Sequence, residues 1–238
     1  MLKAYSAFSK QGKLSLNEDT YFVDPVLQIF ILVDGFGGRA NSEAAFIEAR
    51  DSVKTFLEKA SQDKNATLPY KVRSHNTMTG NLLLNAIIFA NKNIIGKNKN
   101  LSINSRTGAS IIVGKIEGSI LTLASVGNLS CHRVFGKKVE EVIRPDCSCK
   151  INGDDNSHSP VRFLGSKDDI EPSISEFRVK QGDNFILSSV GVYTYLSNDD
   201  YISLIYQNAS NERIITDIVN RAEISGSPYN MTGILLKF

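Results

Sequence analysis

Five consecutive apolar residues, Ile29 to Val33, most constrain what this chain can fold into. A strand with one face in water alternates apolar and polar residues, so an uninterrupted run indicates a strand that is buried on both faces. The run ends on Asp34, and Gly-Phe-Gly-Gly follows at 35–38. A carboxylate at the end of a buried strand is costly unless it is paired or binds a cation, and glycines there let the backbone approach a ligand closely.

Two interpretations of Asp34 remain open from the residues alone. Asp34 either caps a turn from strand to helix, or it binds a hard cation such as Mg²⁺ or Mn²⁺ together with a backbone carbonyl. Glu18 and Asp19 precede residues 21–23, which predict a neighbouring strand. Pairing of the two strands would bring both acids to the level of Asp34, where a divalent cation would relieve their repulsion. Otherwise Glu18 and Asp19 are solvated loop residues.

The rest of the chain predicts further helices and strands within a single domain. Apolar residues at helical spacing predict helices at 41–60, 79–95, 199–209 and 212–224. Runs typical of strands occur at 2–9, 26–33, 109–114, 119–126, 131–134, 139–142, 174–179, 184–188 and 231–238. No shift in composition and no repeat divides the sequence, which predicts one domain over 1–238.

Composition excludes several classes of protein. The chain has 27 basic and 25 acidic residues, a net charge of +2, and no long basic run that would favour binding to nucleic acid. No apolar stretch reaches the ~18 residues needed to span a bilayer, and residues 1–12 lack the apolar core of a signal peptide. The three cysteines, Cys131, Cys147 and Cys149, are few and odd in number, which indicates reduced thiols. We therefore expect a cytoplasmic globular protein.

Six separated motifs resemble those of the metal-dependent protein phosphatases, the PPM or type 2C Ser/Thr phosphatase family, and occur in the same order. They are SLNEDTYFV at 15–23, VDGFGG at 33–38, RTGASIIV at 106–113, TLASVGNLSCHRV at 122–134, FILSSVGVYTYLSNDD at 185–200 and GSPYNMTGILLKF at 226–238. The resemblance covers nearly the whole chain. It implies an α+β fold, a four-layer α-β-β-α sandwich in which two antiparallel sheets are flanked by helix pairs.

The resemblance also implies where metal ions would bind. In this family two Mg²⁺ or Mn²⁺ ions share a bridging Asp, bind the phosphate and activate the water that attacks phosphorus. Asp34 corresponds to this bridging ligand, and would be catalytic if the protein is active, while Gly35 corresponds to the residue that supplies a backbone carbonyl. Glu18 and Asp19 correspond to the acids beside the second ion.

Other positions depart from the family pattern. Val190 replaces the metal-binding Asp of a Ser-Asp-Gly motif, and Tyr229 replaces the Asp of an Asp-Asn-Ile-Thr motif that binds the same ion. Asn128 replaces an Asp that is tied to a third ion in some members. The phosphate-binding Arg is missing, and the nearby cation, Lys13, lacks the two-pronged contact that Arg makes. Because two ligands of one ion are lost together, we expect one bound Mg²⁺ or Mn²⁺, or none.

The resemblance and its departures favour a pseudophosphatase that acts in signalling by binding a protein or phosphoprotein partner. The alternative is an active Mg/Mn-dependent phosphoserine/phosphothreonine phosphatase with weak or altered metal dependence. A third, weaker alternative is a sensor that binds a small ligand or nucleotide in the same cleft. Whether the polar stretch at 144–160 forms the family's flap beside the site stays open.

Overall fold

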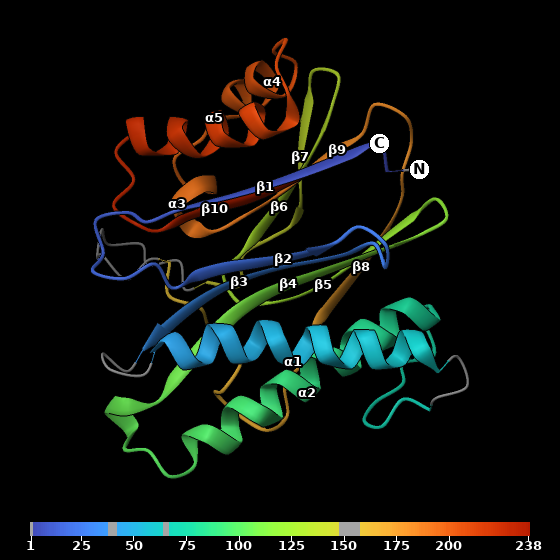
Figure 1. Ribbon diagram of the computed structural model, residues 1–238, viewed down its shortest axis with the longest axis vertical. Coiled ribbons are helices and arrows are strands. Elements are labelled where there is room, and N and C mark those ends of the chain that lie inside the picture. Colours follow the sequence, from blue (N-terminus) through green and yellow to red (C-terminus); the bar gives the residue numbers. More distant parts are fainter. Residues whose placement is uncertain (1, 38–41, 64–66, 148–157) are drawn as a thin grey trace.

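Two sheets packed face to face form the centre of the molecule, with helices on both outer sides (Figure 1). The computed structural model describes residues 2–37, 42–63, 67–147 and 158–238. This arrangement confirms the four-layer α+β sandwich that the family resemblance implied. No helix in these ranges is both long and apolar enough to cross a bilayer.

The first sheet carries the acidic residues singled out in the sequence. Its five strands are all antiparallel, in the order β2 (Asp19–Asp24), β3 (Ile29–Gly37), β4 (Thr107–Glu117), β5 (Ile120–Val126) and β8 (Ser173–Arg178). Helices α1 (Ser42–Gln62) and α2 (Met78–Asn98) cover its outer face (Figure 1). A 3₁₀ turn, η1 (Ile103–Ser105), precedes β4.

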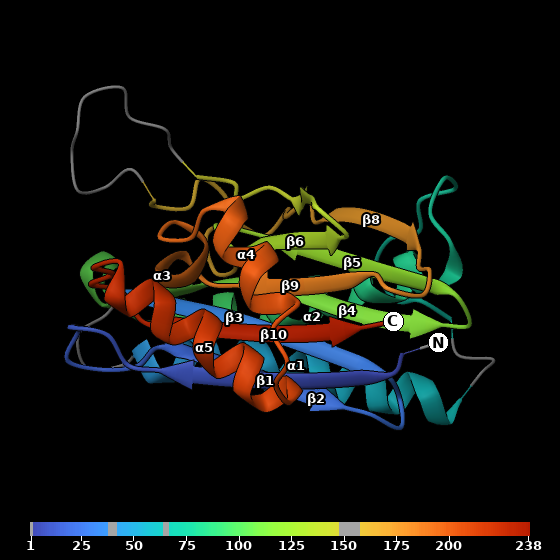
Figure 2. The same cartoon turned by 90° about the horizontal axis from the view of Figure 1, so that it is seen from above.

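The second sheet completes the sandwich. Its antiparallel strands follow the order β1 (Ala4–Lys10), β10 (Met231–Lys237), β9 (Asn184–Ser188), β6 (Ser130–Phe135) and β7 (Lys138–Ile143). Helices α4 (Asn198–Ile205) and α5 (Asn211–Ile224) cover its outer face, and the short α3 (Val190–Tyr193) follows β9 directly. The two termini lie on the same side of the molecule (Figure 2), because β1 and β10 pair along their whole length.

The apolar run in β3 is buried on both faces, as its sequence predicts. Ile29, Ile31 and Val33 pack against α1 and α2, whereas Phe30 and Leu32 pack between the two sheets, and all five are at most 2% exposed. This alternation is the two-residue period of a strand whose two faces both meet apolar layers.

The structure corrects several expectations for local structure. The strand β3 continues past Asp34 to Gly37, because residues 35–37 pair with 107–109 of β4. Asp34 therefore lies within a strand, and the interpretation that it caps a turn into a helix is wrong, since α1 begins only at Ser42. The helix predicted at 199–209 ends earlier, at Ile205, and α3 was not predicted at all.

Candidate functional site

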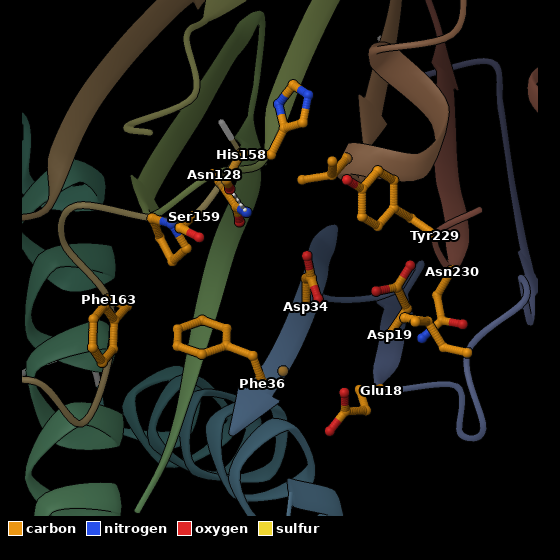
Figure 3. A pocket seen from close by; sticks show the side chains of 14 residues that line it. Glu18, Asp19, Asp34, Phe36, Asn128, His158, Ser159, Phe163, Tyr229 and Asn230 are labelled. Atoms are coloured by element: carbon orange, nitrogen blue, oxygen red, sulfur yellow. Dashed lines mark hydrogen bonds between the residues drawn. The ribbon is translucent and has the colours of Figure 1, made fainter. Parts of the chain in front are cut away.

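A pocket of about 420 Å³ opens where the ends of β2 and β3 meet α3 and the loops around the second sheet (Figure 3). We call it the acidic pocket because the carboxylates of Glu18, Asp19 and Asp34 line it. Its lining consists of Leu14, Glu18, Asp19, Asp34, Gly35, Phe36, Asn128, His158, Ser159, Pro160, Phe163, Val190, Tyr229 and Asn230.

Two of the predicted ligands, Asp19 and Asp34, form the centre of this pocket. They are directly opposed residues of the antiparallel pair β2–β3, and the Gly35 N–H donates to the Glu18 carbonyl at 3.0 Å. Burial raises the pKa of both carboxyl groups above the usual range, and repulsion between the acids raises the pKa of Asp34 further. The buried Oδ2 atom of Asp19 has no hydrogen-bond partner among the described residues. A bound cation would satisfy this oxygen and relieve the repulsion.

Glu18 does not join the two aspartates. Its carboxylate points away from them (Figure 3), since successive side chains along an extended chain point to opposite sides. Within the described ranges no three His, Cys, Asp or Glu side chains form a group that could hold a metal ion. The expected convergence of three carboxylates is thus reduced to a pair. The donors that fit a hard cation are the carboxylates of Asp19 and Asp34, with Gly35 in the adjoining wall.

Val190 and Tyr229, where the family resemblance implies replaced aspartates, line the same pocket. Val190 begins α3 and is 5% exposed, and the Tyr229 ring lies 6.2 Å from the His158 ring. A Cβ atom on Gly191 would lie only 2.2 Å from the Asn230 carbonyl oxygen, so these two segments touch. The wall that would carry carboxylates in the family pattern is therefore formed by an isopropyl group and a phenol ring.

Asn128, the third position where the resemblance implies a replaced aspartate, connects two segments in the pocket wall. The Ser110 hydroxyl donates to Asn128 Oδ1 at 2.7 Å, and Asn128 Nδ2 donates to the His158 carbonyl at 2.6 Å. The Tyr193 hydroxyl donates to the Asn128 carbonyl at 2.9 Å. The side chain is buried and both of its polar ends are used, so it holds β4 and the segment at 158 together.

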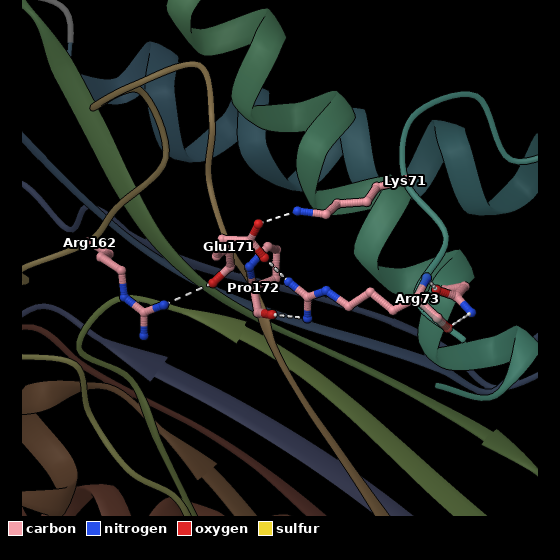
Figure 4. A network of polar contacts seen from close by, with 6 residues as sticks. Lys71, Arg73, Arg162, Glu171 and Pro172 are labelled. Atoms are coloured by element: carbon pink, nitrogen blue, oxygen red, sulfur yellow. Dashed lines mark hydrogen bonds and ion pairs between the residues drawn. The ribbon is translucent and has the colours of Figure 1, made fainter. Parts of the chain in front are cut away.

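The strap, residues 158–172, forms one side of the pocket and was not predicted to have a defined structure. Its Leu164 exchanges both backbone hydrogen bonds with Ala109 of β4. Farther along, the Glu171 carboxylate pairs with Lys71 and Arg73, and Arg162 donates to the Glu171 carbonyl at 2.9 Å (Figure 4). These contacts hold the strap against β4 and the segment that precedes α2. Residues 148–157, most of the stretch considered as a flap, lie outside the described residues.

Lys13, the predicted phosphate ligand, is exposed and does not line the pocket. Its backbone N–H donates to the Pro228 carbonyl at 2.9 Å, and the neighbouring Gly12 N–H donates to Asn230 Oδ1 at 3.1 Å. Asn230 also donates to the Leu16 carbonyl at 2.9 Å and so fixes the loop ahead of β2. This role of Asn230 is not evident from the sequence. The described lining contains no Lys or Arg that could hold a phosphate.

Comparison with known proteins rests on structure alone, since no family model and no curated protein matches the sequence. PppA of Pseudomonas aeruginosa, described as a key regulatory component of T6SS, is 18% identical, with 99% of this chain and 98% of that chain covered and a TM-score of 0.81. The Mycobacterium tuberculosis serine/threonine phosphatase PstP/Ppp is also 18% identical, with 100% and 99% covered and a TM-score of 0.80.

Two further structures show what similar folds bind. The catalytic domain of PstP was solved with two manganese ions, at 18% identity and a TM-score of 0.78 over 98% of this chain and 97% of that chain. The PPM Ser-Thr phosphatase MsPP of Mycobacterium smegmatis, in complex with cacodylate, is 15% identical, with 100% and 99% covered and a TM-score of 0.79. Identities this low establish the fold and not the activity. This chain has the fold of the PPM Ser/Thr phosphatases.

Proposed function

We propose that this protein is a pseudophosphatase, a PPM-fold domain that binds a protein partner and does not hydrolyse phosphate esters. The observation that carries the proposal is that Val190 and Tyr229 line the acidic pocket together with the two aspartates. Hydrolysis by two metal ions requires both ions, because together they bind the phosphate oxygens and lower the pKa of the attacking water. A valine supplies no oxygen ligand, and a neutral phenol is a poor one for Mg²⁺.

The remaining donors support one ion at most. Asp19, Asp34 and the Gly35 carbonyl would hold a single Mg²⁺ or Mn²⁺, which when bound would act as a Lewis acid toward an oxygen ligand. The two aspartates set the position of this ion through their opposed places in β2 and β3. The described lining of the pocket contains no Lys or Arg, so no such side chain could replace the second ion in binding phosphate.

The test is turnover of p-nitrophenyl phosphate and of a phosphothreonine peptide with Mn²⁺. We expect no turnover above a blank with the protein omitted, whereas a rate within about tenfold of an ordinary ~10 s⁻¹, absent in Asp34→Ala, would refute the proposal. Calorimetry with Mn²⁺ should give one ion per chain or none.

Restoring the lost ligands sharpens this test. The double variant Val190→Asp/Tyr229→Asp should gain a second Mn²⁺ and turnover, because it returns two carboxylates to one wall of the pocket. The matched control is Val190→Asn/Tyr229→Asn, which changes the same positions without adding charge. Thermal unfolding with and without Mn²⁺ reports whether each variant folds and whether the metal binds it.

The alternative, an active phosphatase with altered metal dependence, is favoured by one observation, the facing carboxylates of the buried Asp19 and the half-buried Asp34. It predicts that wild-type protein already turns over substrate and that the double variant changes the rate little. For a role in signalling, the support is that PppA is described as a regulatory component.

A further inference from the structure

A second pocket, of about 550 Å³, lies at the C-terminal end of α2, and we call it the basic pocket. Four cationic side chains and one carboxylate line it. Its full lining is Lys92, Ile95, Gly96, Asn98, Lys99, Arg106, Gly165, Ser166, Lys167 and Asp168. Concave surfaces with one sign of charge concentrate ions of the opposite sign, so this pocket suits an anion.

The cations of the basic pocket are available to a ligand. Lys99, Arg106 and Lys167 are exposed, and no ion pair joins any of them to a residue in the described part of the chain. Lys92 also lies outside any such pair, although its Nζ atom is 5.6 Å from the centre of the Tyr70 ring. By contrast, Lys97 on the same helix pairs with Glu48. The unpaired charges are thus gathered at the pocket and not simply spread along α2.

Two buried asparagines of α2 hold the walls of the basic pocket. Asn98 accepts from the Thr107 N–H at 3.1 Å and donates to the Thr107 carbonyl at 2.7 Å, which fixes the backbone next to Arg106. Asn91 accepts from the Gly165 N–H at 2.8 Å and donates to the Lys167 carbonyl at 2.9 Å, which fixes the strap. Cations from three separate segments are therefore presented on a fixed frame.

The helix supplies the floor of the pocket. Lys92 and Lys99 are seven residues apart and so lie on the same face of α2. Gly96 lies between them, and a Cβ atom built there would meet nothing within 4 Å. The space above this glycine is therefore open to a ligand.

The two pockets share the strap. Phe163 lines the acidic pocket, and residues 165–168 line the basic pocket. Arg106 lies four residues before Ser110, the strand partner of Asp34, a separation of about 13 Å in extended chain. A single extended peptide lying across the strap could therefore reach both pockets.

We propose that the basic pocket binds a phosphorylated segment of a protein partner, an inference that rests on the partner-binding function proposed above. A phosphate group carries close to two negative charges and matches clustered cations, and the planar guanidinium of Arg106 can bind it with two parallel hydrogen bonds. The lining has no aromatic ring on which a nucleotide base could stack, and the net charge of the chain is only +2. Both facts favour a phosphopeptide over nucleic acid.

The test is a binding titration with a short peptide that carries one phosphothreonine, measured by fluorescence anisotropy on the full chain in EDTA. EDTA removes divalent cations, so hydrolysis at the acidic pocket cannot consume the probe. The variant Lys99→Gln/Arg106→Gln should weaken binding by about tenfold or more, because it removes charge-assisted hydrogen bonds. The matched control is Lys137→Gln/Lys138→Gln, which removes two exposed cations at the β6–β7 turn and should bind as the wild type does.

Each other outcome overturns the inference. Equal binding of the unphosphorylated peptide would exclude recognition of the phosphate, and equal loss in the control variant would reduce the effect to net charge. Loss in Asp34→Ala, with Lys99→Gln/Arg106→Gln unaffected, would assign the peptide to the acidic pocket. Tighter binding of a single-stranded oligonucleotide would indicate nucleic acid instead. The proposed pseudophosphatase function is tested separately, because turnover of a phosphate ester in Mn²⁺ would refute it without affecting this binding result. Thermal unfolding confirms that the variants remain folded.

Discussion

The acidic and basic pockets lie on either side of the same strap, yet their charges are held in different ways. In the acidic pocket, Asp19 and Asp34 are fixed by paired strands, and burial raises the pKa of both. In the basic pocket, Lys99, Arg106 and Lys167 are exposed and keep their hydration. Buried like charges destabilise the fold until an ion binds, whereas exposed charges cost little.

The two pockets also differ in how much their walls can change. The Val190–Tyr229 wall is locked by direct backbone contact, while the floor of the basic pocket has open space above Gly96. Three substitutions test this difference, in order of decreasing effect on the free energy of unfolding.

The largest effect is expected from Gly191→Ala in the wall of the acidic pocket. The new Cβ atom would lie 2.2 Å from the Asn230 carbonyl oxygen, a backbone atom that cannot turn away as a flexible side chain would. We expect a loss of about 3 kcal/mol in the free energy of unfolding, measured by urea denaturation. An unchanged midpoint would contradict the tight contact between α3 and the segment before β10.

A smaller effect, of opposite sign, is expected from Asp34→Asn. The pKa of Asp34 is raised in the folded state by burial and then by Asp19, so the ionised carboxylate destabilises the fold at neutral pH. An amide removes this repulsion and can donate to Asp19, so the metal-free variant should gain about 1 to 2 kcal/mol at pH 7.

This gain has two signatures that can be measured by thermal unfolding. It should shrink as the pH falls through the raised pKa of Asp34, because protonation then relieves the wild type as well. Mn²⁺ should stabilise the wild type more than the variant. The matched control is Asp169→Asn, an exposed carboxylate outside the lining of either pocket, which should change little. A variant less stable than the wild type in EDTA would contradict the assignment of repulsion to this pair.

The smallest effect is expected from Gly96→Ala at the floor of the basic pocket. Nothing lies within 4 Å of the new Cβ atom, and alanine lowers the entropy cost of forming the helix interior. The free energy of unfolding should rise by about 0.5 to 1 kcal/mol. If this variant instead destabilises the protein as Gly191→Ala does, the contrast between an open and a locked pocket is wrong.

The local pattern of apolar and polar residues predicted most of the helices and strands. The apolar run from Ile29 predicted a strand buried on both faces, and the pairing with its neighbour brings Asp19 to the level of Asp34 as expected, although Asp19 is the first residue of β2 and does not lie ahead of it. Glu18 lines the same pocket, but its carboxylate points away from the two aspartates because adjacent side chains along a strand diverge. The end of β3 was misjudged because its glycines, read as a turn, are held in the sheet by pairing with β4.

From its motifs alone, the sequence predicted the layered fold and the strand pairing that brings Asp19 to Asp34. The family resemblance further implied that Val190 and Tyr229 stand where carboxylates would bind a metal ion. Only the tertiary structure decided that Val190 and Tyr229 share one wall, that Asn128 is used to hold the strap, and that Lys99, Arg106 and Lys167 surround one pocket. The difference follows from how far apart along the chain the interacting residues lie. Motifs reflect chemistry between near neighbours in the chain, whereas a pocket depends on contacts between segments that are brought together only when the whole sandwich packs.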